Sequence, residues 1–174
     1  SAEYFARAGV ALFTRMGCVD YLCFGAENAD ITQLKKIADI LADEPRSYQD
    51  ALNRYLREGK NFPAARILAL KSYLSAESSC TALETEQLTS LLSTPNNILG
   101  IEYLKALKTC RSQITPYPIL REGAGYHDTD ILLKNASASA IRQTLKQAGS
   151  SGSAPDFASF SAAMPQEAFR IFSE

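Results

Sequence analysis

The stretch Thr94–Lys105, which reads TPNNILGIEYLK, predicts the helix around which the rest of the chain is arranged. Its apolar residues recur every three or four positions, as they do on one face of a helix. Thr94 suits the position before a helix, and Pro95 suits the first helical position, where a missing N–H breaks no hydrogen bond. We therefore expect a helix that begins at Pro95 and continues past Lys105.

The first turns of this predicted helix contain residues that helices disfavour. Asn96 and Asn97 prefer caps and turns, and Gly100 inside a helix costs about 1 kcal/mol relative to alanine. Their spacing also puts Asn96, Gly100 and Tyr103 on one face. Two interpretations are open: a helix start whose free N–H groups face an anionic ligand, or a tightly packed helix whose glycine lets a neighbour approach. The local propensities favour the ligand-facing helix.

The composition is that of an ordinary globular protein. The chain has 174 residues, of which 46% are hydrophobic and 21% charged, and this length predicts one domain with a sizeable core. The net charge of −1 does not by itself indicate a nucleic-acid-binding protein. Residues 100–150 nevertheless carry seven basic and four acidic residues, so a mildly basic surface is expected there.

The cysteines and the absence of long apolar runs predict a cytoplasmic protein. Cys18, Cys23, Cys80 and Cys110 lack the paired spacing of zinc ligands, and we expect buried, reduced thiols. The apolar runs are too short for a signal peptide or a membrane span, so no membrane association is expected. The chain starts at Ser1 inside a helical pattern, which suggests a piece of a longer protein.

A predicted helix over residues 2–16, ended by Gly17, leads directly into a predicted strand over residues 19–25. The strand is almost entirely apolar without alternation, which is typical of a buried strand in a parallel sheet. A helix that enters such a strand is the second half of a crossover unit, so a preceding strand is implied. Residues 25–29 then leave the carboxyl end of the strand, the edge at which open α/β sheets bind ligands.

Residues 31–93 predict a group of core-forming amphipathic helices. Asp30 with Gln33, and Thr81 with Glu84, have the spacing of helix-capping pairs. Further residues mark ends and starts of helices, namely Pro45, Gly59 and Pro63.

The second predicted strand covers residues 114–121. Pro116 and Pro118 cannot donate hydrogen bonds to a neighbouring strand, so they indicate the edge of the sheet. The following loop, residues 123–128, contains the only histidine, His127. Without a second histidine or clustered carboxylates it is a weak candidate for a metal ligand or an acid–base group. The sequence assigns no metal ligand and no catalytic residue.

Residues 137–148 predict a helix whose first turn is a candidate phosphate cradle. Ser137 and Ser139 supply hydroxyl groups and Arg142 supplies a positive charge. The alternative is a serine N-cap with a solvated arginine. The glycine- and serine-rich residues 149–155 predict a flexible linker, and a hydrophobic terminal helix follows.

Four motifs extend the interpretation to nearly the whole chain. They are FGAEN at residues 24–28, PNNILGIEYLKAL at 95–107, GAGYHD at 123–128 and SASAIR at 137–142. Together and in this order they resemble the bacterial tRNA(Met) cytidine acetate ligase family, which is similar to HxGH nucleotidyltransferases. The resemblance implies a predominantly helical α/β protein with a partial Rossmann-like nucleotidyltransferase fold, two adjacent parallel strands and a helical insertion. The implied domains are 1–30 with 94–148 for the nucleotidyltransferase, 31–93 for the insertion, and 149–174 for a linker and C-terminal helix.

The resemblance implies an ATP-dependent, tRNA-modifying ligase. The family activates acetate as acetyl-adenylate and acetylates N4 of the wobble cytidine of elongator tRNA(Met). The implied ligands are therefore ATP, with Mg²⁺, acetate and this tRNA. Motif matching gives Gly25, Asn96 and Arg121 as nucleotide-binding positions.

The SASAIR motif resembles the Ser-Ser-Thr-x-Ile-Arg phosphate loop of related nucleotidyltransferases. Alanine replaces its second serine, and serine replaces its threonine. This match adds Ser137, Ser139 and Arg142 to the implied nucleotide site.

The family's first strand and histidine-bearing loop would precede Ser1, so we expect this chain alone not to form acetyl-adenylate. For tRNA, the basic bias suggests a surface formed by Lys105, Lys108 and Arg111. Two further basic residues, Arg66 and Lys71, are the alternative, although a solvated helix face is the simpler interpretation of both.

Two other functions remain open at this point. One is a non-catalytic module that binds a nucleotide, tRNA or another protein. The other is a cofactor adenylyltransferase, against which the long helical insertion argues. A His-x-x-His motif just after a first strand would favour the ligase over the binding module.

Overall fold

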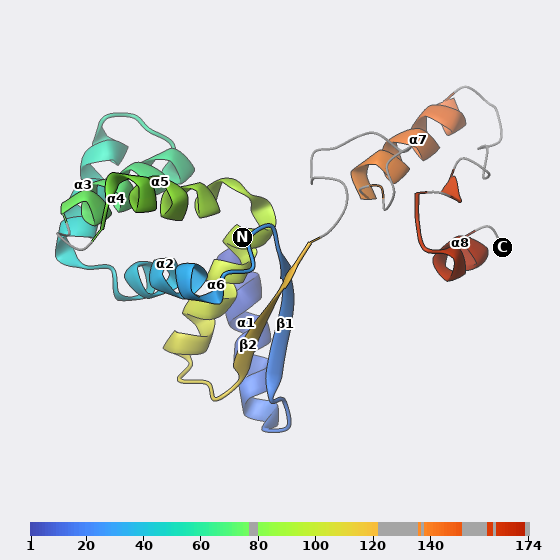
Figure 1. Cartoon of the computed structure of the whole chain (residues 1–174), viewed down its shortest axis with the longest axis horizontal. Helices are drawn as coiled ribbons and strands as arrows, with labels where there is room; N and C mark the ends of the chain where they lie inside the picture. Colours follow the sequence, from blue (N-terminus) through green and yellow to red (C-terminus); the bar gives the residue numbers. More distant parts are fainter. Residues whose placement is uncertain (77–79, 122–135, 137, 151–159, 162, 173–174) are drawn as a thin grey trace. The chain divides into compact units, whose positions relative to one another are not determined.

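Helix α6 (Pro95–Thr109) is the central element of the first part of the chain. It packs against α1 (Ala2–Met16), α2 (Ile31–Asp43) and β1 (Tyr21–Ala26), as Figure 1 shows. The helix predicted from TPNNILGIEYLK is therefore confirmed, and it begins at Pro95 as expected.

The computed structural model describes residues 1–76, 80–121, 136, 138–150, 160–161 and 163–172. These residues belong to two units, Ser1–Arg121 and Glu122–Glu174, and each is described by itself. The proposed division into a nucleotidyltransferase domain, an insertion and a C-terminal segment stays a prediction.

Strands β1 and β2 (Thr115–Leu120) form a parallel pair, as predicted. The register runs from Tyr21 opposite Thr115 to Ala26 opposite Leu120, so both strands end at the same edge. This adjacency confirms the predicted fold, in which two distant segments become neighbouring strands.

The prediction of a fully buried first strand is wrong. Phe24 and Ala26 are buried, whereas Tyr21, Cys23 and Gly25, which alternate with them, are exposed. Helix α6 packs on one face of β1, and no described element of this unit covers the other face. An almost entirely apolar sequence therefore does not distinguish a strand that is buried on both faces from one that is buried on one face only.

The helices predicted between the strands are present. They are α2, α3 (Arg46–Arg57), α4 (Phe62–Ala76), α5 (Ala82–Ser90) and the short 3₁₀ turn η1 (Leu91–Ser93). Thr81 and Glu84 form the predicted reciprocal capping box. Asp30 caps α2 by accepting from the N–H groups of Thr32 and Gln33, but the Gln33 side chain accepts from Asn28 instead of completing a box.

Gly100 lies where α6 crosses β1. It is buried, and a Cβ atom at this position would be 2.6 Å from a ring atom of Phe24. The Phe24 ring also packs 5.8 Å from the ring of Tyr103, centroid to centroid. The packing interpretation of Gly100 is confirmed, and the ligand-facing interpretation is wrong for Gly100.

The second unit contains α7 (Ala138–Ser150) and α8 (Gln166–Phe172), which confirm the two predicted C-terminal helices. Helix α7 includes Gly149 and Ser150, so the predicted linker does not begin at residue 149. Residues 151–155 and the loop that holds His127 lie outside the described residues. Phe160 and Ala163 of this unit are buried.

The cysteine prediction was wrong for two of the thiols. Cys18 and Cys23 are exposed, and Cys80 and Cys110 are partly buried. Cys18 follows the left-handed Gly17 that ends α1, and Cys23 is on the open face of β1. Along the described residues, no helix combines the length and the apolar character that crossing a membrane needs.

Candidate functional site

The shared carboxyl end of β1 and β2 brings Gly25 and Arg121 together. The Arg121 N–H donates to the carbonyl oxygen of Ala26 over 2.9 Å, which extends the ladder by one residue. The Arg121 side chain then lies over Gly25, where a Cβ atom would be 3.3 Å from Cγ and 3.7 Å from Cδ. Both residues are exposed. The edge therefore carries a guanidinium group whose aliphatic stem lies against the Gly25 backbone.

Asn96, in the first turn of α6, contacts the loop that follows β1. Its side-chain amide donates to Oε1 of Glu27 over 2.6 Å. The backbone N–H groups of Asn96 and Asn97 also donate to Glu27, over 3.4 Å to Oε1 and 2.9 Å to Oε2. The predicted anion at this helix start is therefore the protein's own carboxylate.

Sequence reasoning missed Glu27 as a site residue. The signal available was its position: an acidic residue two positions after Gly25, at the strand end that meets ligands in open α/β sheets. The sequence could not show that this loop contacts the start of α6, which lies about seventy residues later in the chain.

A second set of hydrogen bonds fixes the same loop. The buried Oδ1 of Asn97, a residue only 2% exposed, accepts from the backbone N–H of Asn28 over 3.0 Å. The Asn28 side chain accepts from the N–H of Asp30 over 2.8 Å and donates to Gln33 over 3.3 Å. The loop is thus held by α6 on one side and by the start of α2 on the other.

Burial raises the pKa of Glu27, but hydrogen bonds from the Asn96 amide and from the backbone N–H groups of Asn97 and Asn96 lower it more. The net result is a pKa below the ordinary glutamate value of 4.5. Glu27 therefore carries a negative charge at neutral pH.

Thr94 occupies the cap position of α6 without acting as the side-chain cap that the sequence predicted. Its Oγ1 is buried and has no hydrogen-bond partner among the described residues. Glu27 takes this role, because its carboxylate accepts from N–H groups in the first turn.

The three residues of the candidate phosphate cradle belong to the second unit. Ser139 and Arg142 are in the first turns of α7, with Arg142 exposed, and Ser137 lies outside the described residues. The cradle stays a prediction.

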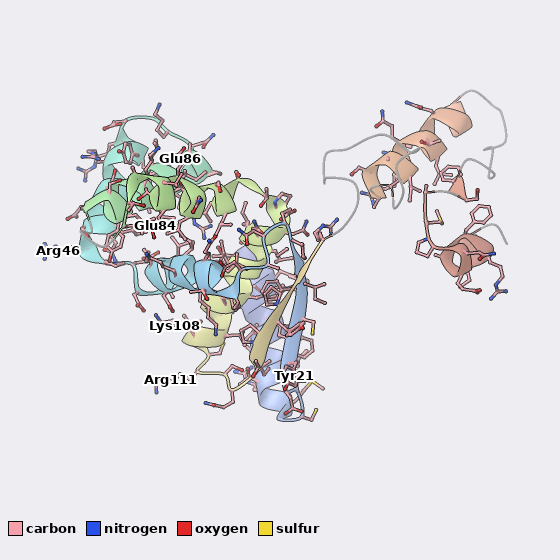
Figure 2. All side chains as sticks on the ribbon, in the orientation of Figure 1. Tyr21, Arg46, Glu84, Glu86, Lys108 and Arg111 are labelled. Atoms are coloured by element: carbon pink, nitrogen blue, oxygen red, sulfur yellow. The ribbon has the colours of Figure 1, made fainter. Side chains whose placement is uncertain are left out.

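The predicted basic surface is largely neutralised within the protein. Lys108 is paired with Asp39 and Asp43 of α2 at 2.9 and 2.8 Å, whereas the exposed Arg111 makes no ion pair among the described residues (Figure 2). The hydrogen bonds from Lys108 to Asp43 and Asp39 raise the pKa of its amine.

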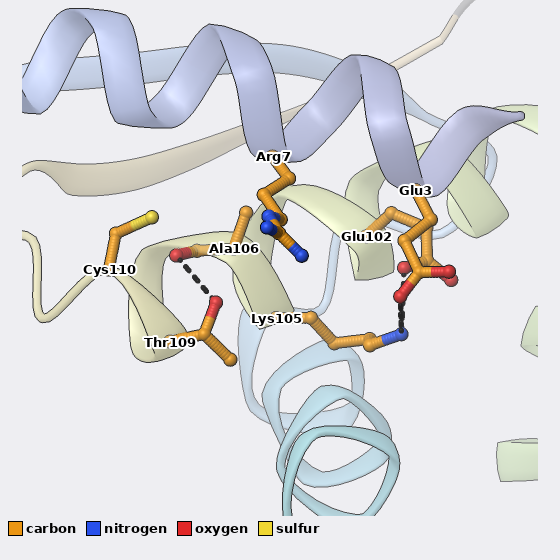
Figure 3. A pocket seen from close by; sticks show the side chains of 7 residues that line it. All are labelled: Glu3, Arg7, Glu102, Lys105, Ala106, Thr109 and Cys110. Carbon is orange, nitrogen blue, oxygen red and sulfur yellow. Dashed lines mark hydrogen bonds and ion pairs between the residues drawn. The ribbon is translucent and has the colours of Figure 1, made fainter.

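Lys105 lies in a pocket of about 320 Å³ between α1 and the second half of α6 (Figure 3). It is paired with Glu102 at 2.9 Å and with Glu3 at 3.5 Å. Glu102 is only 4% exposed and also accepts from Arg66 over 2.7 Å. The two carboxylates and the two basic groups of this cluster balance each other, which indicates a structural role. Arg7, which also lines the pocket, makes no ion pair among the described residues.

The two basic residues of the alternative tRNA surface also form ion pairs. Arg66 is paired with Glu102, and Lys71 is paired with Glu86 at 2.6 Å. Within the described residues, no three His, Cys, Asp or Glu side chains gather as metal ligands.

Comparison with known proteins identifies the family that this chain resembles. The HIGH Nucleotidyl Transferase family matches residues 1–174. The tRNA(Met) cytidine acetate ligases of Alkaliphilus metalliredigens and Clostridium acetobutylicum are 47% and 43% identical to this chain. The alignments cover 86% and 84% of this chain and 35% and 36% of those proteins. The chain therefore spans about a third of the length of these relatives.

Two solved structures of Thermotoga maritima TmcAL resemble the chain. The apo form has a TM-score of 0.86 and 31% identity, and it matches 99% of this chain and 38% of TmcAL. The form bound with alpha-thio ATP has a TM-score of 0.79 and 29% identity, and it matches 99% of this chain and 37% of TmcAL.

Proposed function

The chain belongs to the HIGH nucleotidyl transferase family, and on that premise we propose that it forms part of the ATP site of a tRNA(Met) cytidine acetate ligase. The proposed enzyme activates acetate as acetyl-adenylate and transfers the acetyl group to N4 of the wobble cytidine of elongator tRNA(Met), in the cytoplasm. Relatives with this name and a similar TmcAL structure bound with alpha-thio ATP support the proposal.

The chemistry explains why a guanidinium group is useful at this edge. An oxygen of acetate attacks the α-phosphorus of ATP, the bond to the β-phosphate breaks, and pyrophosphate leaves. The N4 amine of cytidine then attacks the acetyl carbonyl, AMP leaves with the bonding electrons, and N4 loses one proton to the solvent. Negative charge builds on the phosphates in the first step, and positioned donors stabilise such charge.

The observation that carries the proposal is the contact between Arg121 and Gly25. Because Gly25 has no side chain, the Arg121 side chain can lie across the strand end, which places its guanidinium group at the edge where open α/β sheets bind ligands. Arg121 supplies charge-assisted hydrogen bonds to phosphate at the same place. Asn96 is the third proposed nucleotide-binding residue of this unit. Ser137, Ser139 and Arg142, which the motif match also assigns to nucleotide binding, belong to the second unit and stay a prediction.

The described residues do not fit a protein-held Mg²⁺. Mg²⁺ at nucleotide sites is usually held by one or two carboxylates together with the phosphates. The carboxylate near this edge, Glu27, already accepts three N–H donors. No step proposed for this chain depends on the metal.

The test is Arg121→Ala in the full-length gene product, measured by acetate-dependent exchange of pyrophosphate into ATP. Each lost charge-assisted hydrogen bond is worth about 1.5–3 kcal/mol, so we expect exchange to slow about tenfold to a hundredfold. Arg57→Ala, at the exposed end of α3, is the matched control and should leave the rate unchanged.

Equal rates for the wild type and Arg121→Ala would contradict the assignment of Arg121. ATP binding by the wild type without any exchange would favour the alternative, a non-catalytic nucleotide- or tRNA-binding module.

A further inference from the structure

The contact between Glu27 and Asn96 fixes which atom Asn96 offers to a ligand. A charged carboxylate only accepts hydrogen bonds, so the Asn96 atom 2.6 Å from Oε1 is the amide nitrogen. The amide oxygen, Oδ1, accordingly points to the other side, and it makes no hydrogen bond within the described part of the chain. Asn96 is only partly buried, and its Oδ1 is not among the buried side-chain atoms that lack a hydrogen-bond partner, so this oxygen is accessible to solvent in the described part of the chain.

Glu27 also changes the electrostatic character of the α6 start. Free N–H groups at a helix start normally attract phosphate. Here those of Asn96 and Asn97 donate to Glu27, which adds a full negative charge. A triphosphate has acceptor oxygens and negative charge at neutral pH, so this end of the site disfavours it. Arg121, beside Gly25, is the favourable end.

We propose that Glu27 is a positioning residue that makes Asn96 an acceptor for the donor groups of the nucleoside, and that the triphosphate is held at Arg121. Three groups of adenosine can donate to such an acceptor: the 2′-hydroxyl, the 3′-hydroxyl and the adenine amino group. This inference rests on the proposed function, because it assigns an orientation to the ATP that the function requires.

The test compares ATP, adenosine and inorganic tripolyphosphate by calorimetric titration of the full-length gene product. Glu27→Gln places an amide opposite Asn96, which removes the charge and the constraint on the Asn96 amide. We expect adenosine and ATP to bind Glu27→Gln at least about tenfold more weakly, as for the loss of one hydrogen bond to a charged or well-placed group. Tripolyphosphate should bind as in the wild type or more tightly.

Arg121→Ala should show the opposite pattern, with weaker binding of ATP and tripolyphosphate and unchanged binding of adenosine. Glu86→Gln removes an exposed carboxylate that is paired with Lys71, and it serves as the control that should change none of the three affinities. Thermal melts of each variant show whether it is folded.

Asn96→Ala keeps the inference testable if Glu27→Gln does not fold. It removes the acceptor oxygen while leaving the bond from Asn97 N–H to Glu27, and alanine is the better helix former. We expect the same selective loss of adenosine binding. Among wild-type titrations with 2′-deoxyadenosine, 3′-deoxyadenosine and purine riboside, the analogue that binds more weakly identifies the recognised donor.

Two results would overturn the inference while leaving the proposed function intact. One is equal weakening of tripolyphosphate and adenosine in Glu27→Gln, and the other is unchanged adenosine binding in Asn96→Ala. If the wild type does not bind ATP at all, the proposed function fails and this inference fails with it.

Discussion

Gly100 is the residue at which packing and helix propensity oppose each other. On propensity alone, Gly100→Ala would stabilise α6 by about 1 kcal/mol. The new Cβ would approach the Phe24 ring to 2.6 Å, and overpacking a core typically costs about 1–3 kcal/mol. We expect a net loss of about 1 kcal/mol in the free energy of unfolding, measured with urea.

Gly9 is the matched control for this substitution. It lies inside α1, and a Cβ there would have no neighbour within 4 Å among the described residues. Gly9→Ala should stabilise the protein by up to about 1 kcal/mol. If Gly100→Ala stabilised it as much, Phe24 would have moved aside easily, and the close packing would not limit this position.

Glu27 should make stability depend on pH in the acidic range. Its pKa is lowered below 4.5 in the folded protein, so its contribution is present above the unfolded value and is lost as the pH falls through the folded value. Wild type should therefore be more stable than Glu27→Gln near neutral pH, and the two should converge below 4.5. The urea midpoints of unfolding of the two proteins, measured from neutral to acidic pH, test this prediction. A difference between the two midpoints that stays constant over this pH range would contradict it.

Single residues could be predicted where chain order alone decides their place. Gly25 and Arg121 each follow an apolar run, and two parallel strands end at one edge, so their meeting followed from the pattern. The carboxylate of Glu27 on the α6 start could not be predicted, because it depends on the angle at which a loop leaves its strand. Gly100 was ambiguous for a related reason. A glycine in a helix indicates that another group comes close to the backbone, but it does not show whether that group is a ligand or a packed side chain.

At the scale of elements, the two threonine caps provide a comparison. Thr81 accepts from the N–H of Glu84 in a complete capping box, whereas the buried Oγ1 of Thr94 has no partner among the described residues. Thr81→Val should cost about 1 kcal/mol in the free energy of unfolding. Thr94→Val should not lower it and should raise it by up to about 1 kcal/mol, because a methyl group replaces a buried hydroxyl that has no partner among the described residues.

Chemical unfolding of both variants measures this difference. A loss for Thr94→Val as large as that for Thr81→Val would mean that Thr94 caps α6 after all. The backbone of Thr94 is extended, with φ −114° and ψ 135°, so valine fits there without strain.

Helix positions followed from the sequence better than strand burial did. Caps, prolines and glycines are local signals, and they predicted the starts of α2, α5 and α6 and the end of α1. Whether a strand is covered on one face or two depends on other elements. Tyr21 and Cys23 are apolar or weakly polar, and nothing local distinguishes them from core residues.

At the scale of the whole molecule, the charge composition predicted a basic surface, but it could not show that Lys105 and Lys108 are paired with carboxylates of the protein itself. In the full-length gene product we expect Arg111→Glu to weaken tRNA binding and to reduce its salt dependence. Lys108→Gln should leave tRNA affinity unchanged and lower the unfolding temperature slightly, because it releases Asp39 and Asp43 of α2.

Filter binding at several salt concentrations measures both effects. Arg46→Glu, which changes an exposed arginine on α3 far from Arg111 along the chain, is the matched control (Figure 2). An equal loss for Arg46→Glu and Arg111→Glu would show that the surface at the end of α6 has no special part in tRNA binding.

The open face of β1 has a practical consequence for chemical labelling. Cys23 is exposed on that face two positions before Gly25, and alternate residues of a strand lie about 6.5 Å apart. A maleimide fluorophore can therefore be attached beside the proposed nucleotide edge without an engineered cysteine. Cys18, exposed beyond the end of α1, provides an internal reference thiol on the same chain.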